Sequence, residues 1–217
     1  VQQDIEQACA CNVSHLSVYH LTLEPNTWFY QHPPRLPDDD QSADMQEMLE
    51  QLLAEKGYGN YEISAFAKSG QECRHNLNYW RYGDYLGIGA GAHSKISFRE
   101  KILRQIRHKH PRQYLEQVKS SNDAMVFIAQ EQVVTSRDRV FEFMMNTLRL
   151  TEGFVPALFQ SHTGLALSVI QKQLELAEQQ NLITWAHDKI QPTRLGRRYL
   201  NDLLAIFLPD DVSSPVR

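Results

Sequence analysis

Hydrophobic and polar residues follow two different patterns in the two halves of the chain. In the first half, apolar positions with helical spacing at 44–56 lie between two short runs, HLSVYHL at 15–21 and YEISAFA at 61–67. Both runs are rich in β-branched and aromatic residues, which is typical of strands. With a helix end expected at 2–11, the order is helix, strand, helix, strand, which favours an α/β fold with a parallel sheet. Because so few strands are clear, we expect this half to be the tail of a larger α/β domain.

The helix expected at 44–56 has signals at both ends. Asp38 to Asp40 follow a proline-rich stretch and offer a side-chain cap for the first backbone amides. Gly57 follows the last apolar position and is a common stop residue. Further along, LGIGAGAH and ILRQIRH are weaker strand candidates.

The second half has helical spacing over longer stretches. TSRDRVFEFMMNTLRL at 135–150 begins with Thr135 or Ser136 as a cap and places its large apolar residues on one face. A second apolar stripe at 167–177 precedes LITW, the turn AHDK and IQPT, and a last helix runs through 199–207. Helix, short hairpin and helix in this order resemble a winged helix. We therefore divide the chain into an α/β part at 1–120 and a small helical, winged-helix-like part at 121–217.

Composition narrows the class of protein without identifying it. The 217 residues are 42% hydrophobic and 22% charged, with a net charge of −4, so no general attraction to nucleic acid or anionic membrane is expected. The sequence has neither an apolar run long enough for a membrane helix nor the pattern of a signal peptide, which predicts a cytoplasmic protein. Cys9, Cys11 and Cys73 are too few and too unevenly spaced for a disulfide framework.

The densest candidate chemistry lies in CRHNLNYWRYGDYLGIGAGAHS at 73–94. His75 and Tyr79 are four residues apart, and both residue types serve as axial ligands of haem iron. Asn76 could hydrogen-bond a histidine nitrogen, and Trp80 could cover a porphyrin face. The alternative is a loop histidine whose hydrogen bonds are made by backbone groups, and residue types alone favour this alternative.

The other residues of this stretch also allow two interpretations. The glycines of GIGAGA could let the backbone approach a ligand, but they lack the spacing of a dinucleotide site, so tight packing at a strand end is favoured. Cys73 could be a thiolate ligand, although a lone cysteine is more often inert. His93 is similarly more typical of a packed residue at a strand end than of a ligand.

Four separated segments resemble one family in order: HLSVYHLTLEPNT, YEISAFAKSGQECRHNLNYWRYGDYLGIGAGAHS, FEFMMNTLRL and YLNDLLAIFL. They resemble the HemW family of radical S-adenosylmethionine proteins, which are related to the oxygen-independent coproporphyrinogen III oxidase. The resemblance implies the C-terminal part of a partial β/α barrel, followed by a small helical domain. It also implies a [4Fe–4S] cluster that binds S-adenosylmethionine and is held by a CxxxCxxC motif. That motif is absent here, and in the family it belongs to an N-terminal portion that would precede Val1.

The resemblance also assigns roles to residues of this chain. The family's proposed haem-binding motif HNxxY corresponds to His75, Asn76 and Tyr79, with Trp80 adjoining, and we expect it to form a loop. A weaker correspondence places four residues against the S-adenosylmethionine pocket: Leu21, Thr22, Ala92 and His93. No residue of this chain is assigned to the cluster, so we expect the chain alone to carry no cluster and to be catalytically inactive.

Three functions follow as hypotheses. The first, implied by the resemblance, is a haem chaperone that delivers haem to a respiratory protein, works with the missing N-terminal portion, and associates at most peripherally with a membrane. The second is an enzyme like the oxygen-independent coproporphyrinogen III oxidase. The third is a winged-helix nucleic-acid-binding module or a plain interaction domain. Residues 166–217 contain six basic and six acidic side chains, and we therefore expect no nucleic-acid binding.

Overall fold

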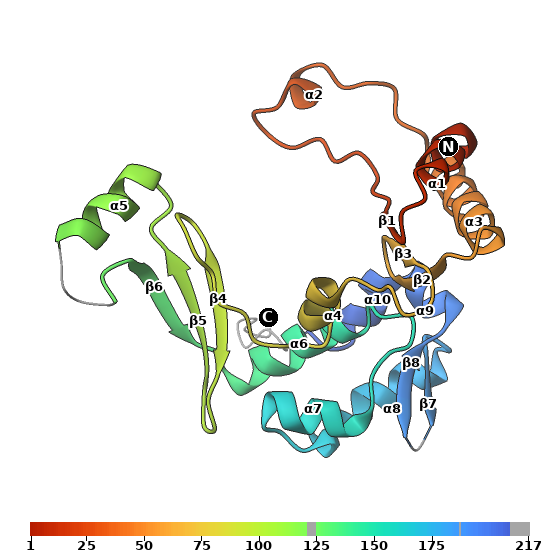
Figure 1. Cartoon of the computed structure of the whole chain (residues 1–217). Helices are drawn as coiled ribbons and strands as arrows, with labels where there is room; N and C mark the ends of the chain where they lie inside the picture. Colours follow the sequence, from red (N-terminus) through yellow and green to blue (C-terminus); the bar gives the residue numbers. More distant parts are fainter. Residues whose placement is uncertain (121–124, 187, 209–217) are drawn as a thin grey trace, which may run out of the picture. The chain divides into compact units, whose positions relative to one another are not determined.

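The computed structural model describes residues 1–120, 125–186 and 188–208, and the chain divides into two compact units. The first unit, Val1–Arg74, runs from red to yellow in Figure 1, and the second unit, His75–Arg217, continues to blue. The domain boundary expected at residue 120 falls inside the second unit. The division of the chain into domains at that residue stays a prediction. Three of the charged residues counted above lie outside the described residues: Asp210, Asp211 and Arg217.

The first unit combines helices with a small sheet. Its elements are α1 (Gln2–Ala10), β1 (His15–Ser17), α2 (Trp28–Gln31), α3 (Asp39–Glu55), β2 (Gly59–Glu62) and β3 (Ala65–Ala67). The sheet has the order β1-β3-β2, and both pairings are antiparallel, with His15 opposite Ala67. The expectation of a parallel sheet is therefore wrong for these strands. The single strand expected at 61–67 is a hairpin, because the chain reverses at Ile63 and Ser64.

The helix expected at 44–56 is confirmed and starts earlier, as α3. Asp38 caps it by accepting a hydrogen bond from the amide of Gln41, whose side chain accepts one from the Asp38 amide in return. The core of this unit places α1 and α3 against the sheet. Its buried members are Ile5, Leu49, Leu53, Tyr58 and Phe66.

The second unit carries two further sheets and most of the helices. Its elements are α4 (Arg74–Trp80), β4 (His93–Ser97), β5 (Ile102–Arg107), α5 (Pro111–Ser120), β6 (Ile128–Val133), α6 (Ser136–Thr147), α7 (Pro156–Thr163), the 3-10 helix η1 (Leu167–Ile170), α8 (Gln171–Gln179), β7 (Ile183–Ala186), β8 (Lys189–Pro192), α9 (Arg194–Arg198) and α10 (Leu200–Ala205). The sheet β4-β5-β6 and the hairpin β7-β8 are antiparallel. Of the two weaker strand candidates, ILRQIRH is confirmed as β5. LGIGAGAH contributes only its last residue, His93, to a strand.

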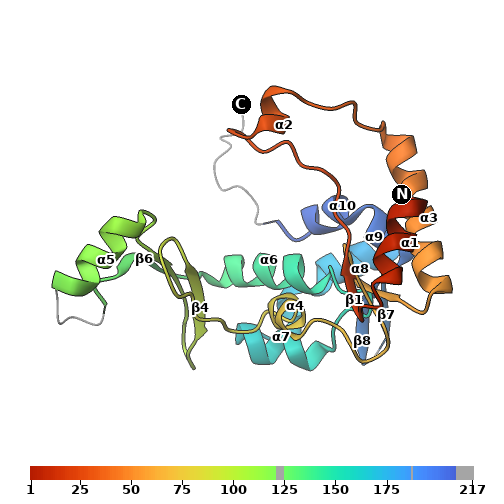
Figure 2. The same ribbon diagram turned by 45° about the horizontal axis from the view of Figure 1, so that its top comes forward.

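The core of the second unit centres on α6. Thr135 caps this helix through the amide of Asp138, as the sequence predicts. The ring of Phe143 packs edge-on against Tyr82, Phe154 and Phe159. In both views of the ribbon, α4 lies beside α6 (Figures 1 and 2).

The predicted order of helix, hairpin and helix is confirmed at the end of the chain. The hairpin β7-β8 pairs Ile183 with Pro192 and follows α8. The last expected helix, through 199–207, is present as α10, and a separate short helix, α9, precedes it. Across the part of the chain that the structure describes, no helix has both the length and the apolar character needed to cross a membrane.

Candidate functional site

The motif HNLNYW lies on a helix, so the expected ligand-bearing loop is wrong. Residues 74–80 form α4, which contains neither glycine nor proline to interrupt the hydrogen-bond pattern. The helix ends at Trp80, and the turn that follows it contains Tyr82, whose backbone has a positive φ of 59°. The amide of Gly83 bonds back to the carbonyl of Asn78 at 2.8 Å.

The helix places His75 and Tyr79 on one face. Their ring centroids are 4.8 Å apart, and the ring planes are inclined at 49°. His75 is exposed, whereas Tyr79 and Asn76 are half-buried. A spacing of four residues brings side chains together on a helix, so the helical conformation is what makes this pair adjacent. An exposed imidazole beside an aromatic ring can reach an external ligand.

Trp80 is held by a contact that the sequence did not indicate. The guanidinium of Arg149 lies 4.4 Å from the centroid of the Trp80 ring. This contact occupies one face of the indole, and only the opposite face can pack against a flat ligand. Trp80 Nε1 and Arg149 Nε are both buried and lack a hydrogen-bond partner among the described residues.

Tyr79 also packs against a second tyrosine, Tyr85. The two rings are stacked with centroids 4.4 Å apart and planes inclined at 25°. The hydroxyl of Tyr85 accepts a hydrogen bond of 2.9 Å from Nη1 of Arg104 on β5. The sequence shows Tyr85 as one aromatic residue among several and gives no sign of its partner.

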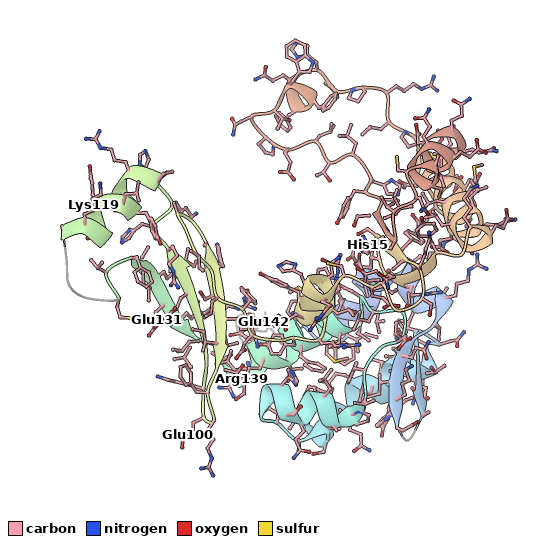
Figure 3. All side chains as sticks on the ribbon, viewed as in Figure 1. His15, Glu100, Lys119, Glu131, Arg139 and Glu142 are labelled. Carbon is pink, nitrogen blue, oxygen red and sulfur yellow. The ribbon has the colours of Figure 1, made fainter. Side chains whose placement is uncertain are left out.

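Arg104 is held in turn by Glu142 on α6, which is labelled in Figure 3. Nε and Nη2 of Arg104 donate to the two carboxylate oxygens at 2.9 and 2.7 Å, and Tyr82 donates to Glu142 Oε2 at 2.8 Å. Such a two-point contact fixes orientation as well as distance. A continuous set of contacts therefore runs from His75 through two tyrosines to the core helix α6.

Burial and neighbouring charges keep the phenols of Tyr79 and Tyr82 neutral. Burial raises the pKa of Tyr79, the neighbouring Tyr85 raises it further, and Arg104 offsets part of the effect. Burial also raises the pKa of Tyr82 far above its usual 10.0, and the charge of Glu142 adds to the rise. Burial alone would lower the pKa of Arg104, but the hydrogen bonds and charge of Glu142 outweigh it and leave that pKa raised. At neutral pH, His75 is therefore better suited than Tyr79 to bind a metal directly.

A buried lysine fixes the turn after α4. Lys95 is 1% exposed, and its ammonium donates to the Tyr82 carbonyl at 2.9 Å and to Asp84 Oδ1 at 3.1 Å. The same ammonium lies 3.9 Å from the centroid of the Tyr82 ring. Burial lowers the pKa of Lys95, and the paired Asp84 only partly restores it. These contacts hold the backbone between α4 and β4 in place.

Close packing explains the first glycine of the glycine-rich segment, Gly87. A Cβ atom on Gly87 would lie 2.2 Å from the backbone carbonyl oxygen of His93, which is too close for any side chain. The Gly87 amide donates to Ser94 Oγ at 2.9 Å. At Gly87, the interpretation of tight packing is therefore favoured over that of a ligand-binding backbone. His93 is exposed at the start of β4.

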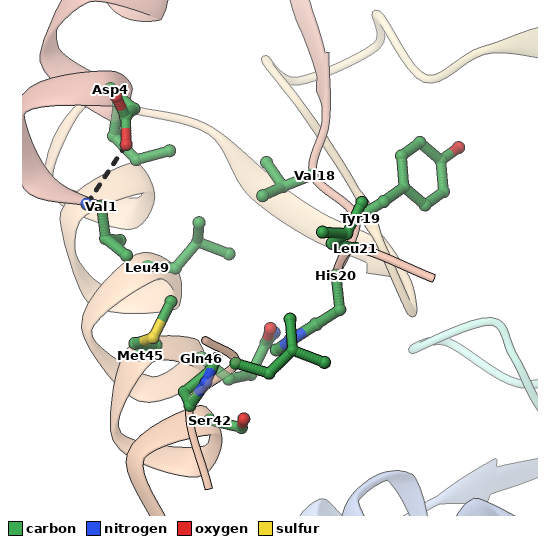
Figure 4. Close-up of a pocket in the computed structure, with 13 residues that line it drawn as sticks. Val1, Asp4, Val18, Tyr19, His20, Leu21, Ser42, Met45, Gln46 and Leu49 are labelled. Atoms are coloured by element: carbon green, nitrogen blue, oxygen red, sulfur yellow. Dashed lines mark ion pairs between the residues drawn. The ribbon is translucent and has the colours of Figure 1, made fainter. Parts of the chain in front are cut away.

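The residues expected at a S-adenosylmethionine pocket are divided between the two units. In the first unit, Thr22 is exposed and Leu21 lines a cavity of about 460 Å³, together with Val18, His20 and others (Figure 4). Ala92 and His93 belong to the second unit, where the Ala92 carbonyl accepts the amide of Arg107 at 2.9 Å. The structure of neither unit brings all four residues together, and their role stays a prediction.

The cysteines do not form a metal site. Cys9, Cys11 and Cys73 are free thiols, and the first two are separated by one residue. Within residues 1–120, 125–186 and 188–208, no three His, Cys, Asp or Glu side chains are grouped closely enough to hold a metal ion. The residues present therefore do not fit a [4Fe–4S] cluster.

Comparisons with known proteins identify relatives over nearly the whole chain. Residues 134–199 match the HemN C-terminal domain. The heme chaperone HemW of Haemophilus influenzae is 44% identical over 209 residues, which are 96% of this chain and 52% of that protein. The heme chaperone HemW of Escherichia coli is also 44% identical, over 95% of this chain and 53% of its own length. The chain is therefore similar to these two HemW proteins over nearly its whole length.

This relation to HemW confirms the resemblance stated from the sequence. The chain spans about half the length of the curated HemW relatives it matches. A solved structure described as "Coproporphyrinogen III oxidase (HemN) from Escherichia coli is a Radical SAM enzyme" has a TM-score of 0.69 with 19% identity, over 94% of this chain and 50% of that one. At that identity the match shows the fold alone, and it agrees with the expected C-terminal part of an α/β fold.

Proposed function

We propose that the chain is the haem-binding half of a heme chaperone of the HemW type. The observation that carries the proposal is the exposed His75 beside Tyr79 on one face of α4. Relatives at 44% identity are named heme chaperones, which supports haem as the cargo. In this proposal haem is the molecule handled and not a resident cofactor.

Each residue of the motif has a distinct task in this proposal. His75 supplies a ring nitrogen to the haem iron, since a neutral imidazole is an effective ligand and no proton of a high-pKa phenol has to be removed. Tyr79 supports the imidazole and offers an aromatic edge to the porphyrin. Trp80 contributes the indole face that Arg149 leaves open, and Asn76 supports the orientation of the helix.

The proposal includes a partner and a location. A chaperone that binds haem through one exposed residue can release it to an acceptor that offers the iron more ligands. We propose that the acceptor is a respiratory protein. Transfer would take place in the cytoplasm or at the inner face of a membrane. S-adenosylmethionine and the [4Fe–4S] cluster, which the family resemblance implies, belong in this proposal to an N-terminal portion with its own cysteine motif.

Substitution of His75 tests the proposal. Haem titration of the 217-residue chain, followed by the Soret band, should give an affinity at least about tenfold weaker for His75→Ala, because the iron loses its axial ligand. The matched control is His108→Ala, which removes a half-buried histidine of the segment between β5 and α5. Equal spectra and affinities for the two variants would remove His75 from the site.

A different assay distinguishes the chaperone hypothesis from the enzyme hypothesis. A full-length protein that transfers haem to an acceptor without converting a porphyrinogen supports the chaperone. Turnover of coproporphyrinogen under reducing, anaerobic conditions would favour the oxidase-like enzyme instead.

A further inference from the structure

We propose that Tyr85, held by Arg104 and Glu142, is a positioning residue that fixes the ring of Tyr79 and thereby the direction in which His75 meets a porphyrin. The inference rests on the proposed haem-binding role of α4. It assigns a function to three residues, on the segment after α4, on β5 and on α6, that lie outside the HNxxY motif.

Both ends of Tyr85 are held. Its amide and carbonyl exchange hydrogen bonds of 3.0 Å with the carbonyl and amide of Lys95 on β4. Its hydroxyl receives the 2.9 Å hydrogen bond from Arg104. With the backbone and the phenol tip both fixed, the ring between them has little freedom to turn.

The anchor behind Tyr85 is equally restrained. Arg104 is bound at two points by Glu142, and Tyr82 supplies a further donor to that carboxylate. Glu142 precedes Phe143 and Met144, which are both fully buried in the core of the second unit. The backbone that carries Glu142 is therefore held by the packed core, and a shift of this part of α6 would disturb that packing.

Through ring stacking, the restrained Tyr85 also restricts the ring of Tyr79 and the side chain of His75 beside it. The ring of Tyr79 contacts both Tyr85 and His75, at centroid distances of 4.4 and 4.8 Å. An exposed histidine on a seven-residue helix would otherwise sample several rotamers. Limiting those rotamers before the ligand arrives lowers the entropy lost on binding, which is how supporting residues raise affinity without touching the ligand.

Three variants of the whole chain test the inference by haem titration and by electron paramagnetic resonance of the ferric complex. Tyr85→Leu removes the stacking, and we expect roughly tenfold weaker binding with a mixture of iron coordination states. Tyr85→Phe keeps the stacked ring and loses the hydrogen bond from Arg104. It should bind haem more tightly than Tyr85→Leu but show a broadened resonance signal, because the ring has lost its anchor. Glu142→Gln releases Arg104 from its ion pair and should broaden the resonance signal while Tyr85 stays in place. The matched control is Tyr114→Leu on α5, which should leave the signal unchanged.

Electron paramagnetic resonance distinguishes a positioning role of Tyr85 from an effect of the substitution on folding. A loss of stability alone reduces the fraction of folded protein and does not alter the coordination of the haem that is bound. Wild-type resonance and affinity in Tyr85→Leu and Glu142→Gln, with binding lost in His75→Ala, would overturn the positioning role and leave the haem site intact. Unchanged binding in His75→Ala would overturn the proposed function and this inference with it. If Tyr85→Leu does not fold, the signal of Glu142→Gln decides the question.

Discussion

Tyr82 combines deep burial with a hydrogen bond to a carboxylate, and this makes it sensitive to alkaline pH. It is 1% exposed, and its pKa is raised in the folded protein by burial first and by Glu142 second. Above pH 10 the unfolded chain loses the Tyr82 proton while the folded chain keeps it, so the unfolded state is favoured. The stabilisation is complete below pH 10 and falls by up to about 1.4 kcal/mol per pH unit above it.

Urea unfolding between pH 8.5 and 11.5 checks this expectation. Tyr82→Phe should be less stable at pH 8.5 but should show a smaller decrease with pH than the unaltered chain. The lowered pKa of Lys95 affects both proteins and does not enter the comparison. Tyr19→Phe, on a tyrosine that is 72% exposed, is the control and should keep the original slope. Parallel slopes for Tyr82→Phe and the unaltered chain would contradict the assignment.

At the residue scale, the sequence showed the motif but neither its conformation nor its support. The four-residue spacing of His75 and Tyr79 is visible in the sequence, but a loop was expected there, and the structure supplies the helix that makes the two side chains adjacent. The contacts of Tyr82 and Arg104 with Glu142 join residues that are 60 and 38 positions apart. A lone glutamate within a helical pattern looks the same whether it faces solvent or binds a buried arginine, and only the tertiary fold distinguishes the two cases.

At the scale of elements, the start of α3 depends on one side chain. Asp38 accepts the amide of Gln41, while the neighbouring Asp39 makes no capping hydrogen bond that the structure records. We expect Asp38→Ala to destabilise the helix by about 1 kcal/mol, and Asp39→Ala to cost only a few tenths through the helix dipole. Hydrogen exchange of the amides at 41–45 should accelerate clearly in the first variant. Equal acceleration in both would show that the cap contributes nothing.

Helices were easier to predict than strands for a physical reason. Apolar periodicity and capping side chains lie within a few residues of each other, and they located α3 and α6 correctly. Strand direction depends on the partner, which a local pattern does not reveal. The run at 61–67 therefore read as one parallel strand, although its reversal at Ile63 and Ser64 makes an antiparallel hairpin without glycine or proline as a signal.

At the scale of the whole molecule, the cysteines set a limit on the chemistry of the chain. A cluster of the radical S-adenosylmethionine type needs three convergent thiolates, whereas this chain has three cysteines in two distant places along the sequence. Anaerobic reconstitution with iron and sulfide should therefore leave the 217-residue chain without a stoichiometric cluster, as measured by bound iron and visible absorption. The matched positive control is a full-length HemW relative. One cluster per chain would show that the cysteines converge after all.

The charge balance of the end of the molecule argues against nucleic-acid binding. The helix α8 occupies the place of a recognition helix, and its sequence QKQLELAEQ carries one lysine and two glutamates. Its Leu174 and Ala177 are fully buried, so its apolar face is used within the unit. Fluorescence anisotropy with random duplex DNA and single-stranded RNA should show no binding at micromolar concentrations in low salt. Salt-sensitive binding, reduced by Arg197→Ala and Arg198→Ala on α9, would instead favour the nucleic-acid hypothesis.

The antiparallel pairing of β1 with β3 has a consequence for synthesis on the ribosome. Ser17 pairs with Ala65, so about 50 residues must be added before the first strand meets its partner. At the usual rate of roughly 5–20 residues per second, the backbone groups of β1 stay unpaired for several seconds in every nascent chain. A translational pause before residue 65 would lengthen that interval, and the codons between β1 and β3 therefore affect how long the growing chain is open to incorrect strand pairing.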